Sequence, residues 1–395
     1  MKKQKRIAYI PKVLHPITRL IIGGAQENTM LTADYLDNHQ WQVDVLAGTQ
    51  TGSEGSIIDE VRNRNIPLFL EASLVREINP LKDIIALCRL IRLIRKHRYH
   101  IVHTHSSKAG IIGRWAAWLA GVPVIVHTVH GWGHHDHQHP LVRKFYILLE
   151  RLTLKITDQL IAVSGKNILK GLDDGIGHYE DYSVIRSGIE LERFGHPQID
   201  RQTMRKKLGI PLNATVIGTV TRLSPQKAPL DFIQAATLLA EKCENVYFIM
   251  VGDGPLHDKV REKAQENNIS QKLIMTGLRR DIPELMNCFD MFVLSSLWEG
   301  LPRVIPQAMA SGLPVIATDI DGSAEIISSE KNGILVPPGK PDCIANAVIK
   351  ILDHPKIRAD LKNAALTTVH EYSAQKMVAL IETLYIKLLE KKTST

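Results

Sequence analysis

Cysteine is scarce in this sequence, and its four residues follow no spacing known for metal sites or disulfide frameworks. Cys88, Cys243, Cys288 and Cys343 stand far apart, and none belongs to a CxxC pair. Scattered cysteines are typical of proteins from a reducing compartment. We therefore expect a cytoplasmic protein.

Long apolar runs are also missing. The most apolar stretch, Ile111–Val129, is interrupted by Arg114, Gly121 and Pro123, which argues against a transmembrane span. The basic N-terminus precedes no long apolar region and no small-residue cleavage site, so a signal peptide is not expected. Internal repeats and low-complexity segments are absent as well.

Aromatic residues make up only 5% of the chain and do not interleave with the basic clusters, so nucleic acid is not an expected partner. Residues 1–199 carry 25 Lys and Arg against 19 Asp and Glu (net +6), and residues 200–395 carry 24 against 22 (net +2), which together give +8. The basic, apolar segment Asn79–Arg98 has two interpretations. It is either a helix that lies on an anionic membrane or a crossover helix that packs on a sheet.

Short apolar runs alternate with helical segments along the whole chain, and 395 residues suggest two domains. This alternation predicts α/β domains with parallel sheets covered on both faces. The expected strands are Lys5–Lys12, Gln42–Ala47, His100–His105, Val122–Thr128, Gln159–Val163, Thr215–Thr221, Val246–Gly252, Leu273–Gly277, Met291–Leu294 and Val315–Thr318. Ligands of such folds gather at the carboxyl ends of the strands.

The stretch Leu294–Gly312, LSSLWEGLPRVIPQAMASG, contains the first candidate site. It predicts a strand, a loop and a helix over Pro302–Ala310, and a helix start in this position is typical of an anion site. The carboxylate of Glu299 can bind hydroxyl groups, and Gly300 lets a ligand approach the backbone.

A second candidate site follows the strand Thr215–Thr221. Arg222 and Lys227 lie five positions apart in a loop before a helix. The fork of Arg and the point charge of Lys suit the different oxygens of a diphosphate.

In the N-terminal half, Gly23 and Gly24 open a loop before a helix, although the pattern is not GxGxxG. Later strands end in histidines and a lysine. We expect this group to share one rim of the sheet: His103, His105, Lys108 and His130.

Two patterns resemble metal sites but do not predict one. The loop Gly133–Pro140, GHHDHQHP, has spacing that suits neither a helix face nor a common zinc site, and we expect it to face an acceptor. The pair Asp319 and Asp321 resembles a DxD motif, but a turn before Glu325 explains it.

Several motifs, in the right order over nearly the whole chain, resemble those of glycosyltransferase family 4. They are the EGLPxxxxQA stretch, the R-x4-K pair, the GDGP turn, the HTH and HTVHG segments, GILVPPG, and YSVIRSGIELERF. Two positions depart from the family pattern: Gln307 replaces its second glutamate, and Ser187 replaces an asparagine.

The resemblance implies a GT-B fold, in which two Rossmann-like domains face each other across a cleft and a C-terminal helix crosses back to the first. The expected first domain, on the acceptor side, spans residues 1–195 with the helix 373–395. The expected donor-binding domain spans 196–372. The family's hinge matches Tyr182–Phe194.

The resemblance also assigns roles to residues. Those around the donor are Gly277 and Leu278 for the base, Gln307 for the ribose, Arg222 and Lys227 for the diphosphate, and Glu299, Gly300 and Leu301 for the sugar. Gly23 and Gly24 are expected near the donor phosphate and the acceptor, and His130 in the catalytic site.

The implied activity is retaining transfer of a sugar, from a UDP-sugar in our expectation, to a glycan or lipid-linked acceptor in surface polysaccharide synthesis. No metal or other cofactor is expected, and the protein is expected at the inner face of the cell membrane. Two alternatives stay open. One is a nucleotide-sugar epimerase of the same fold, and the other, suggested by Gln307, is a non-catalytic nucleotide-sugar-binding subunit.

Overall fold

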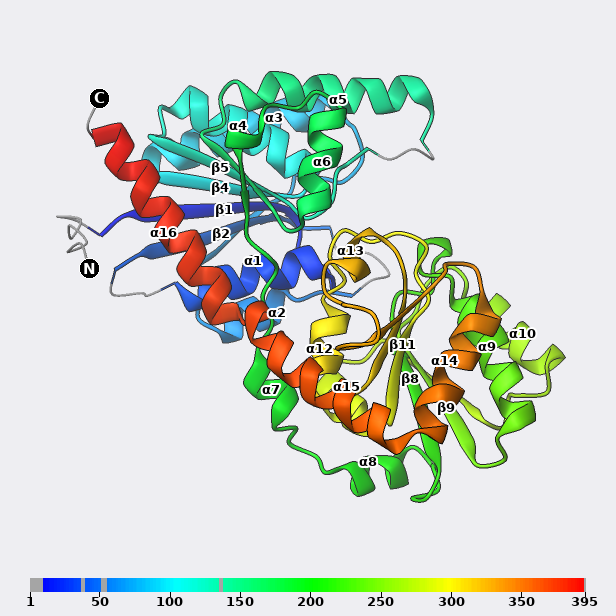
Figure 1. Cartoon of the computed structure of the whole chain (residues 1–395). Helices are drawn as coiled ribbons and strands as arrows, with labels where there is room; N and C mark the ends of the chain where they lie inside the picture. The colour runs from blue at the N-terminus through cyan, green and yellow to red at the C-terminus, as the bar shows by residue number, and fades with distance from the viewer. Residues whose placement is uncertain (1–9, 37–39, 51–54, 135–137, 394–395) are drawn as a thin grey trace. The chain divides into compact units, whose positions relative to one another are not determined.

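The computed structural model describes residues 10–36, 40–50, 55–134 and 138–393, which form two compact units (Figure 1). The first contains Met1–Gly188 and Ala374–Thr395, and the second contains Ile189–Ser373. The division falls inside Tyr182–Phe194 but before the expected boundary at 195/196. The reason is that Ile189 and Phe194 pack in the core of the second unit.

The first unit is built on a seven-stranded sheet in which all strands are parallel. The strand order is β3-β2-β1-β4-β5-β6-β7. The strands are β1 (Lys12–Arg19), β2 (Gln42–Gly48), β3 (Leu68–Glu71), β4 (Ile101–His105), β5 (Val124–Val129), β6 (Gln159–Ala162) and β7 (Tyr182–Val184).

Strand β1 at Lys12–Arg19 was not predicted, and most of the strand predicted at Lys5–Lys12 lies outside the described residues. The sequence obscures β1 because it contains Pro16, which cannot donate a ladder hydrogen bond. The structure accommodates Pro16 because β1 pairs with β4 only at Val13 and Leu14. Beyond Leu14 the strand follows β2 alone, so the missing N–H of Pro16 does not interrupt the pairing with β4.

Helices cover both faces of this sheet. One core is formed with α1, α2 and α16, and a second on α3 and α4, while α5 and α6 pack near β6. As predicted, the C-terminal helix returns to the first unit. The helices are α1 (Gly24–Tyr35), α2 (Ile58–Asn63), α3 (Pro80–His97), α4 (Ser107–Ala120), α5 (Pro140–Leu154), α6 (Gly165–Asp173) and α16 (Ala374–Thr393).

The second unit has a six-stranded parallel sheet in the order β10-β9-β8-β11-β12-β13. The strands are β8 (Thr215–Val220), β9 (Val246–Val251), β10 (Leu273–Gly277), β11 (Met291–Leu294), β12 (Val315–Thr318) and β13 (Ile334–Val336). The helices are α7 (Leu191–Gly195), α8 (Arg201–Lys207), α9 (Pro229–Lys242), α10 (His257–Glu266), α11 (Ile282–Asn287), α12 (Val304–Ala310), α13 (Asp321–Ala324), α14 (Pro341–Asp353) and α15 (Pro355–Thr368).

Candidate active site

The order of strands reverses once in each sheet, between β1 and β4 and between β8 and β11. In an open parallel sheet, this reversal opens a crevice at the carboxyl ends of the two strands, and ligands bind there. In the second unit, the loop after β8 carries Arg222 and Lys227, and the loop after β11 carries Glu299. The topology therefore brings the two predicted motifs together.

Lys227 and Glu299 are in direct contact at this position. The Lys227 ammonium forms an ion pair with Oε1 of Glu299, and the hydroxyl of Ser296 donates to the same oxygen at 2.8 Å. The side chains of Lys227 and Glu299 are only 21% and 8% exposed. Among the described residues, none hydrogen bonds to Oε2, so this oxygen is free to accept a ligand hydroxyl.

Hydrogen bonds between the two loops hold this pair in place. The N–H of Leu297 donates to the carbonyl of Gln226 at 2.8 Å, and the Gln226 amide donates to the carbonyl of Trp298 at 2.9 Å. Ser295 Oγ donates to the carbonyl of Lys227 at 3.1 Å. Sequence reasoning did not single out Ser295 and Ser296, although two serines directly after a buried strand were a usable signal.

The turn after β9 supports the loop of Arg222. A Cβ on Gly252, whose φ is +127°, would lie 1.9 Å from the carbonyl oxygen of Thr221, so only glycine fits there. Leu223 N–H also donates to the carbonyl of Asp253 at 3.0 Å. The side chain of Arg222 is exposed. Thr221, which the sequence did not indicate, has a buried hydroxyl without a partner in the described structure.

The turn after β12 approaches the loop of Glu299 from the other side. A Cβ on Gly322 would lie 2.6 Å from the carbonyl oxygen of Gly300, so the two backbones are in close contact. Leu301 is half-buried. Asp319 and Asp321 are exposed, and Asp321 begins the short helix α13, which agrees with a turn at this position.

Helix α12 begins at Val304 rather than at the predicted Pro302. The first-turn N–H of Ile305 already donates to the carbonyl of Pro302 at 3.0 Å, and Pro306 has no N–H. Ile305 and Pro306 therefore offer no free N–H to an anion, and the predicted anion site at this helix start stays a prediction. Gln307 lies on α12 with its side chain half-buried.

The predicted base-binding positions lie at the end of β10. Gly277 has a φ of +66° and accepts a hydrogen bond from the N–H of Gly252 at 2.9 Å. The side chain of Leu278 is exposed. This contact joins the strand end that carries Gly277 to the turn that supports Arg222.

In the first unit, the Gly23–Gly24 loop follows β1 and leads directly into α1. Gly24 is exposed and Gly23 half-buried, and the carbonyl of Gly23 accepts the first helical hydrogen bond, from Glu27 N–H at 3.0 Å. The loop thus lies at the switch point of this sheet, beside the segment that follows β4.

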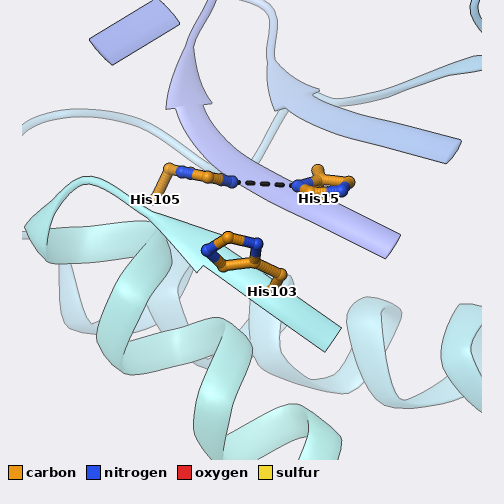
Figure 2. Close-up of side chains that lie close together, drawn as sticks. All are labelled: His15, His103 and His105. Atoms are coloured by element: carbon orange, nitrogen blue, oxygen red, sulfur yellow. Dashed lines mark hydrogen bonds between the residues drawn. The ribbon is translucent and has the colours of Figure 1, made fainter. Parts of the chain in front are cut away.

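Histidines from three neighbouring strands form a hydrogen-bonded chain at the same switch point. Nδ1 of His15 lies 2.9 Å from Nε2 of His105, and Nδ1 of His105 lies 3.1 Å from Nε2 of His130 (Figure 2 shows the first contact). His15 and His105 are fully buried, whereas His130 is half-buried. Burial lowers the pKa of His15 to about 3 and, with the neighbouring imidazoles, holds the pKa of His105 well below its usual value. Both rings are therefore neutral at neutral pH.

The buried end of this histidine chain determines which ring nitrogen donates in each hydrogen bond. Nε2 of His15 is buried and has no partner within the described residues. An unpaired buried N–H is rarer than an unpaired acceptor, so Nε2 is the unprotonated nitrogen and Nδ1 carries the proton. His15 then donates to His105, which in turn donates to Nε2 of His130. The two buried rings thus favour the Nδ1–H tautomer of His130.

The shared rim predicted for the histidines and Lys108 is wrong for His103. His103 is fully buried, and its nitrogens contact the hydroxyls of Tyr385 at 2.5 Å and Thr128 at 2.6 Å. Lys108 forms an ion pair with Asp83 at 2.6 Å. Lys108 and His130 both follow a strand end and are partly exposed, whereas His103 lies within β4.

His15, His103 and His105 also satisfy a geometric condition for metal binding, since one ring nitrogen from each lies within 4.8 Å of the others. Both nitrogens of His103 and both of His105 already have hydrogen-bond partners. A metal ion would have to replace a hydrogen bond at each of these rings. His15 and His105 are joined by their hydrogen bond, and His103 packs beside them with ring centroids 5.1 Å and 4.4 Å away.

Residues 135–137 of the predicted acceptor-facing loop Gly133–Pro140 lie outside the described residues. His134 does not fit that role. Its ring is buried and bonds to Asp174 at 2.9 Å, and Asp174 also pairs with Arg143 at 2.5 Å. His134 thus belongs to a structural cluster that ties this loop to the end of α6.

The chain is similar to two family models, to individual proteins and to solved structures. Residues 200–368 match the family model for glycosyl transferases group 1, and residues 23–166 match a glycosyl transferase 4-like domain. The chain is 33% identical over 385 residues to an Escherichia coli UDP-Gal:alpha-D-GlcNAc-diphosphoundecaprenol alpha-1,3-galactosyltransferase, covering 96% of this chain and 98% of the relative. It is 29% identical to the putative glycosyltransferase EpsF of Bacillus subtilis, covering 78% and 79%.

Among solved structures, Anabaena HepE in complex with UDP-glucose resembles this chain with a TM-score of 0.79 at 23% identity, covering 94% of this chain and 99% of HepE. At that identity the similarity concerns the fold. The described helices include none that is long and apolar enough to cross a membrane.

Proposed function

Because this chain belongs to the group 1 glycosyltransferases with a glycosyltransferase 4-like N-terminal part, we propose a specific reaction for it. It transfers a hexosyl group from a UDP-sugar to a lipid-linked acceptor, with retention of configuration, in surface polysaccharide synthesis. The acceptor class is supported by the name of the E. coli relative, which acts on a diphosphoundecaprenol-linked sugar. The donor class is supported by that name and by the UDP-glucose bound to HepE.

The observation that carries this proposal is the buried contact between Lys227 and Glu299 beside the exposed Arg222. An ammonium has three N–H donors, so Lys227 can hold Glu299 and a donor phosphate oxygen together. Oε2 of Glu299 can accept from a sugar hydroxyl at the same time. One site then holds both the diphosphate and the sugar that it carries.

The remaining donor contacts come from backbone and amide groups. In this proposal Gly300 and Leu301 bind the sugar through their backbone. Gln307 holds the ribose, where its amide can donate to one hydroxyl and accept from another. Gly277 and Leu278 contact the base, and the loop at Gly23 and Gly24 lies near the donor phosphate and the acceptor.

In the transfer step, the bond between the anomeric carbon and the diphosphate oxygen breaks, and the acceptor hydroxyl bonds to the same face of that carbon. The departing phosphate oxygen takes the hydroxyl proton. Negative charge on the leaving group peaks in the transition state, where Arg222 and Lys227 stabilise it. These two cations supply the charge neutralisation, so we propose that the reaction needs no metal ion. In this proposal His130 has a role in the catalytic site.

A lipid-linked acceptor places the reaction at the inner surface of the cell membrane, and we propose peripheral contact there. The test is to incubate the protein with UDP-galactose, UDP-glucose or UDP-N-acetylglucosamine and an undecaprenyl diphosphate sugar, with and without EDTA. We expect a disaccharide product with one UDP-sugar, an α-linkage by NMR, and no loss of rate in EDTA.

Other outcomes would contradict the proposal. Free epimerised sugar nucleotide formed without acceptor would identify an epimerase. Donor binding by thermal shift with neither transfer nor donor hydrolysis would indicate a binding subunit. Rate loss in EDTA that is restored by Mg²⁺ would reject metal-independent transfer, and preference for GDP- or ADP-sugars would reject the UDP donor.

A further inference from the structure

Helix α5 carries an unusual row of exposed apolar side chains. The row consists of Leu141, Phe145, Leu148 and Leu152, which are 70%, 49%, 53% and 43% exposed. Their spacing of four, three and four residues places them on one face of the helix. We call these four residues the α5 ridge. The opposite side of α5 packs through Ile147 onto β6, so the helix does not need the ridge for its own packing.

Cations flank the ridge, and helix α5 itself exposes no acid. Lys144, Arg151 and Lys155 are exposed beside it. The acidic residue of α5, Glu150, is 5% exposed and bonds to the buried Arg114 at 2.6 Å. A 15-residue helix with an exposed apolar row, a basic border and no free anion has the pattern of a helix that lies in the interface of an anionic bilayer.

Two neighbouring helices also expose apolar side chains. Helices α3, α4 and α5 pack side by side on one face of the first sheet. The exposed apolar residues at the start of α3 and the end of α4 are Leu81, Ile84, Ile85, Trp118 and Leu119. The described acid of α3, Asp83, is paired with Lys108, while Arg92 and Lys96 of α3 are exposed. This resolves the two interpretations of Asn79–Arg98: the helix packs on the sheet and still presents a basic, apolar outer face.

We propose that the α5 ridge inserts into the headgroup region of an anionic phospholipid bilayer, with Lys144 and the basic face of α3 contacting lipid phosphates. This inference deepens the proposed function, because it names the surface through which the enzyme reaches a lipid-linked acceptor. A protein partner would need acids to match these cations as well as an apolar groove, whereas an anionic bilayer offers both properties over an area as long as the helix, roughly 22 Å.

The test uses the full chain without donor or acceptor, so it does not depend on the proposed reaction. Flotation is measured with vesicles of phosphatidylcholine alone and with 30% phosphatidylglycerol. We expect binding to the anionic vesicles that weakens with salt. Phe145→Glu with Leu148→Glu should lower binding at least about tenfold, because each places a charge where an apolar group would insert. Lys144→Gln should lower it about fivefold.

Leu169→Glu is the matched control. Leu169 is 58% exposed on α6 of the same unit and is not part of the ridge, and this variant should bind like the wild type. Unchanged binding by the double ridge variant, or equal loss in the Leu169 variant, would overturn the inference. So would a wild-type dimer that the ridge variant converts to a monomer without any vesicle binding, because a second copy would then cover the ridge.

Activity separates this inference from the proposed function. The ridge variant should still transfer sugar to a water-soluble acceptor analogue while losing rate with the acceptor in vesicles. If the wild type binds vesicles through the ridge but transfers sugar to no acceptor, the membrane contact would be supported and the proposed reaction would be contradicted. Equal rate loss on both acceptors would instead place the ridge in the catalytic site and contradict its role as a membrane contact.

Discussion

At Glu299, one carboxylate oxygen is held by Lys227 and Ser296, and the other is left to the ligand. Replacing the group by an amide in Glu299→Gln weakens the pairing with Lys227 and the grip on a sugar hydroxyl together. We expect turnover to fall by about two orders of magnitude or more, since lost charge-assisted contacts of about 3 kcal/mol correspond to that factor. Steady-state kinetics with saturating acceptor measures it. Full activity in this variant would contradict the assigned role.

At Gln307, we expect the opposite change, from amide to carboxylate, to have the opposite effect on the donor. Gln307→Glu restores a carboxylate that can accept from both ribose hydroxyls, so donor binding should tighten, by at most about tenfold. The gain is limited because the new charge is partly desolvated on a half-buried helix position. Calorimetry with UDP measures it. Loss of UDP binding would show that the ribose lies elsewhere.

The cations of the leaving-group site give a third prediction. Arg222→Ala and Lys227→Ala should each lower kcat by about two orders of magnitude, since stabilising one developing oxyanion is typically worth roughly 2.7–4 kcal/mol. Lys259→Ala, on the exposed face of α10, is the matched control and should keep its activity. If both site variants stayed within about threefold of the wild type, the phosphate assignment would be wrong.

The histidine chain predicts a measurable tautomer. Histidine-selective ¹⁵N NMR of the wild type at pH 7.5 should find His130 mainly protonated at Nδ1. His105→Phe removes the donor to Nε2, which should shift the tautomer ratio about fivefold toward Nε2–H, because one hydrogen bond nets about 1 kcal/mol. Replacing the exposed His178 by Phe should leave the His130 signals unchanged. If His130 were protonated mainly at Nε2 in the wild type, the hydrogen bonds of the histidine chain would run in the opposite direction, and the assignment would be contradicted.

Among the elements, the turn after β9 links a glycine to the position of Arg222. Gly252→Ala would place a Cβ against the carbonyl of Thr221 and force alanine to a positive φ. We expect it to lower the free energy of unfolding by roughly 3 kcal/mol or more. Gly209→Ala meets a positive φ of +70° in open space and should cost only about 1–2 kcal/mol. Denaturant titration compares them, and equal losses would argue against the close approach.

For the whole molecule, burial distributes histidines unequally between the units. His15, His103, His105 and His127 are buried in the first unit, and burial lowers the pKa of each. The folded unit keeps these rings neutral, while the unfolded chain takes up protons below its ordinary pKa of about 6.5. Stability is therefore fully present above pH 6.5 and falls as the pH drops toward 3, by about 1 kcal/mol per histidine for each pH unit.

Hydrogen exchange with mass spectrometry tests this difference within one molecule. Between pH 7.5 and 5, after correction for the intrinsic rates, peptides from the first sheet should lose protection before peptides from the second. The second unit serves as the internal control. Equal loss in both units would mean that the buried histidines do not govern acid stability.

The sequence by itself determined the alternating strands and helices, the parallel sheets and the two motifs that meet at Lys227 and Glu299. These follow from hydrophobic periodicity and from short motifs such as the R-x4-K pair, whose members are neighbours in sequence. β1 was missed because Pro16 conceals a strand whose pairing with β4 ends at Leu14. We predicted that α12 begins at Pro302 rather than Val304, because the sequence does not reveal that the N–H of Ile305 donates to the carbonyl of Pro302.

Only the tertiary structure decided which distant side chains meet. The order of strands places β1 beside β4 and β8 beside β11, and thereby joins His15 to His105 and Lys227 to Glu299. Periodicity marks the apolar face of a helix, but whether neighbours cover that face depends on packing between elements far apart in the chain. The four residues of the α5 ridge and the buried His103 were therefore indistinguishable in the sequence from ordinary core and rim positions.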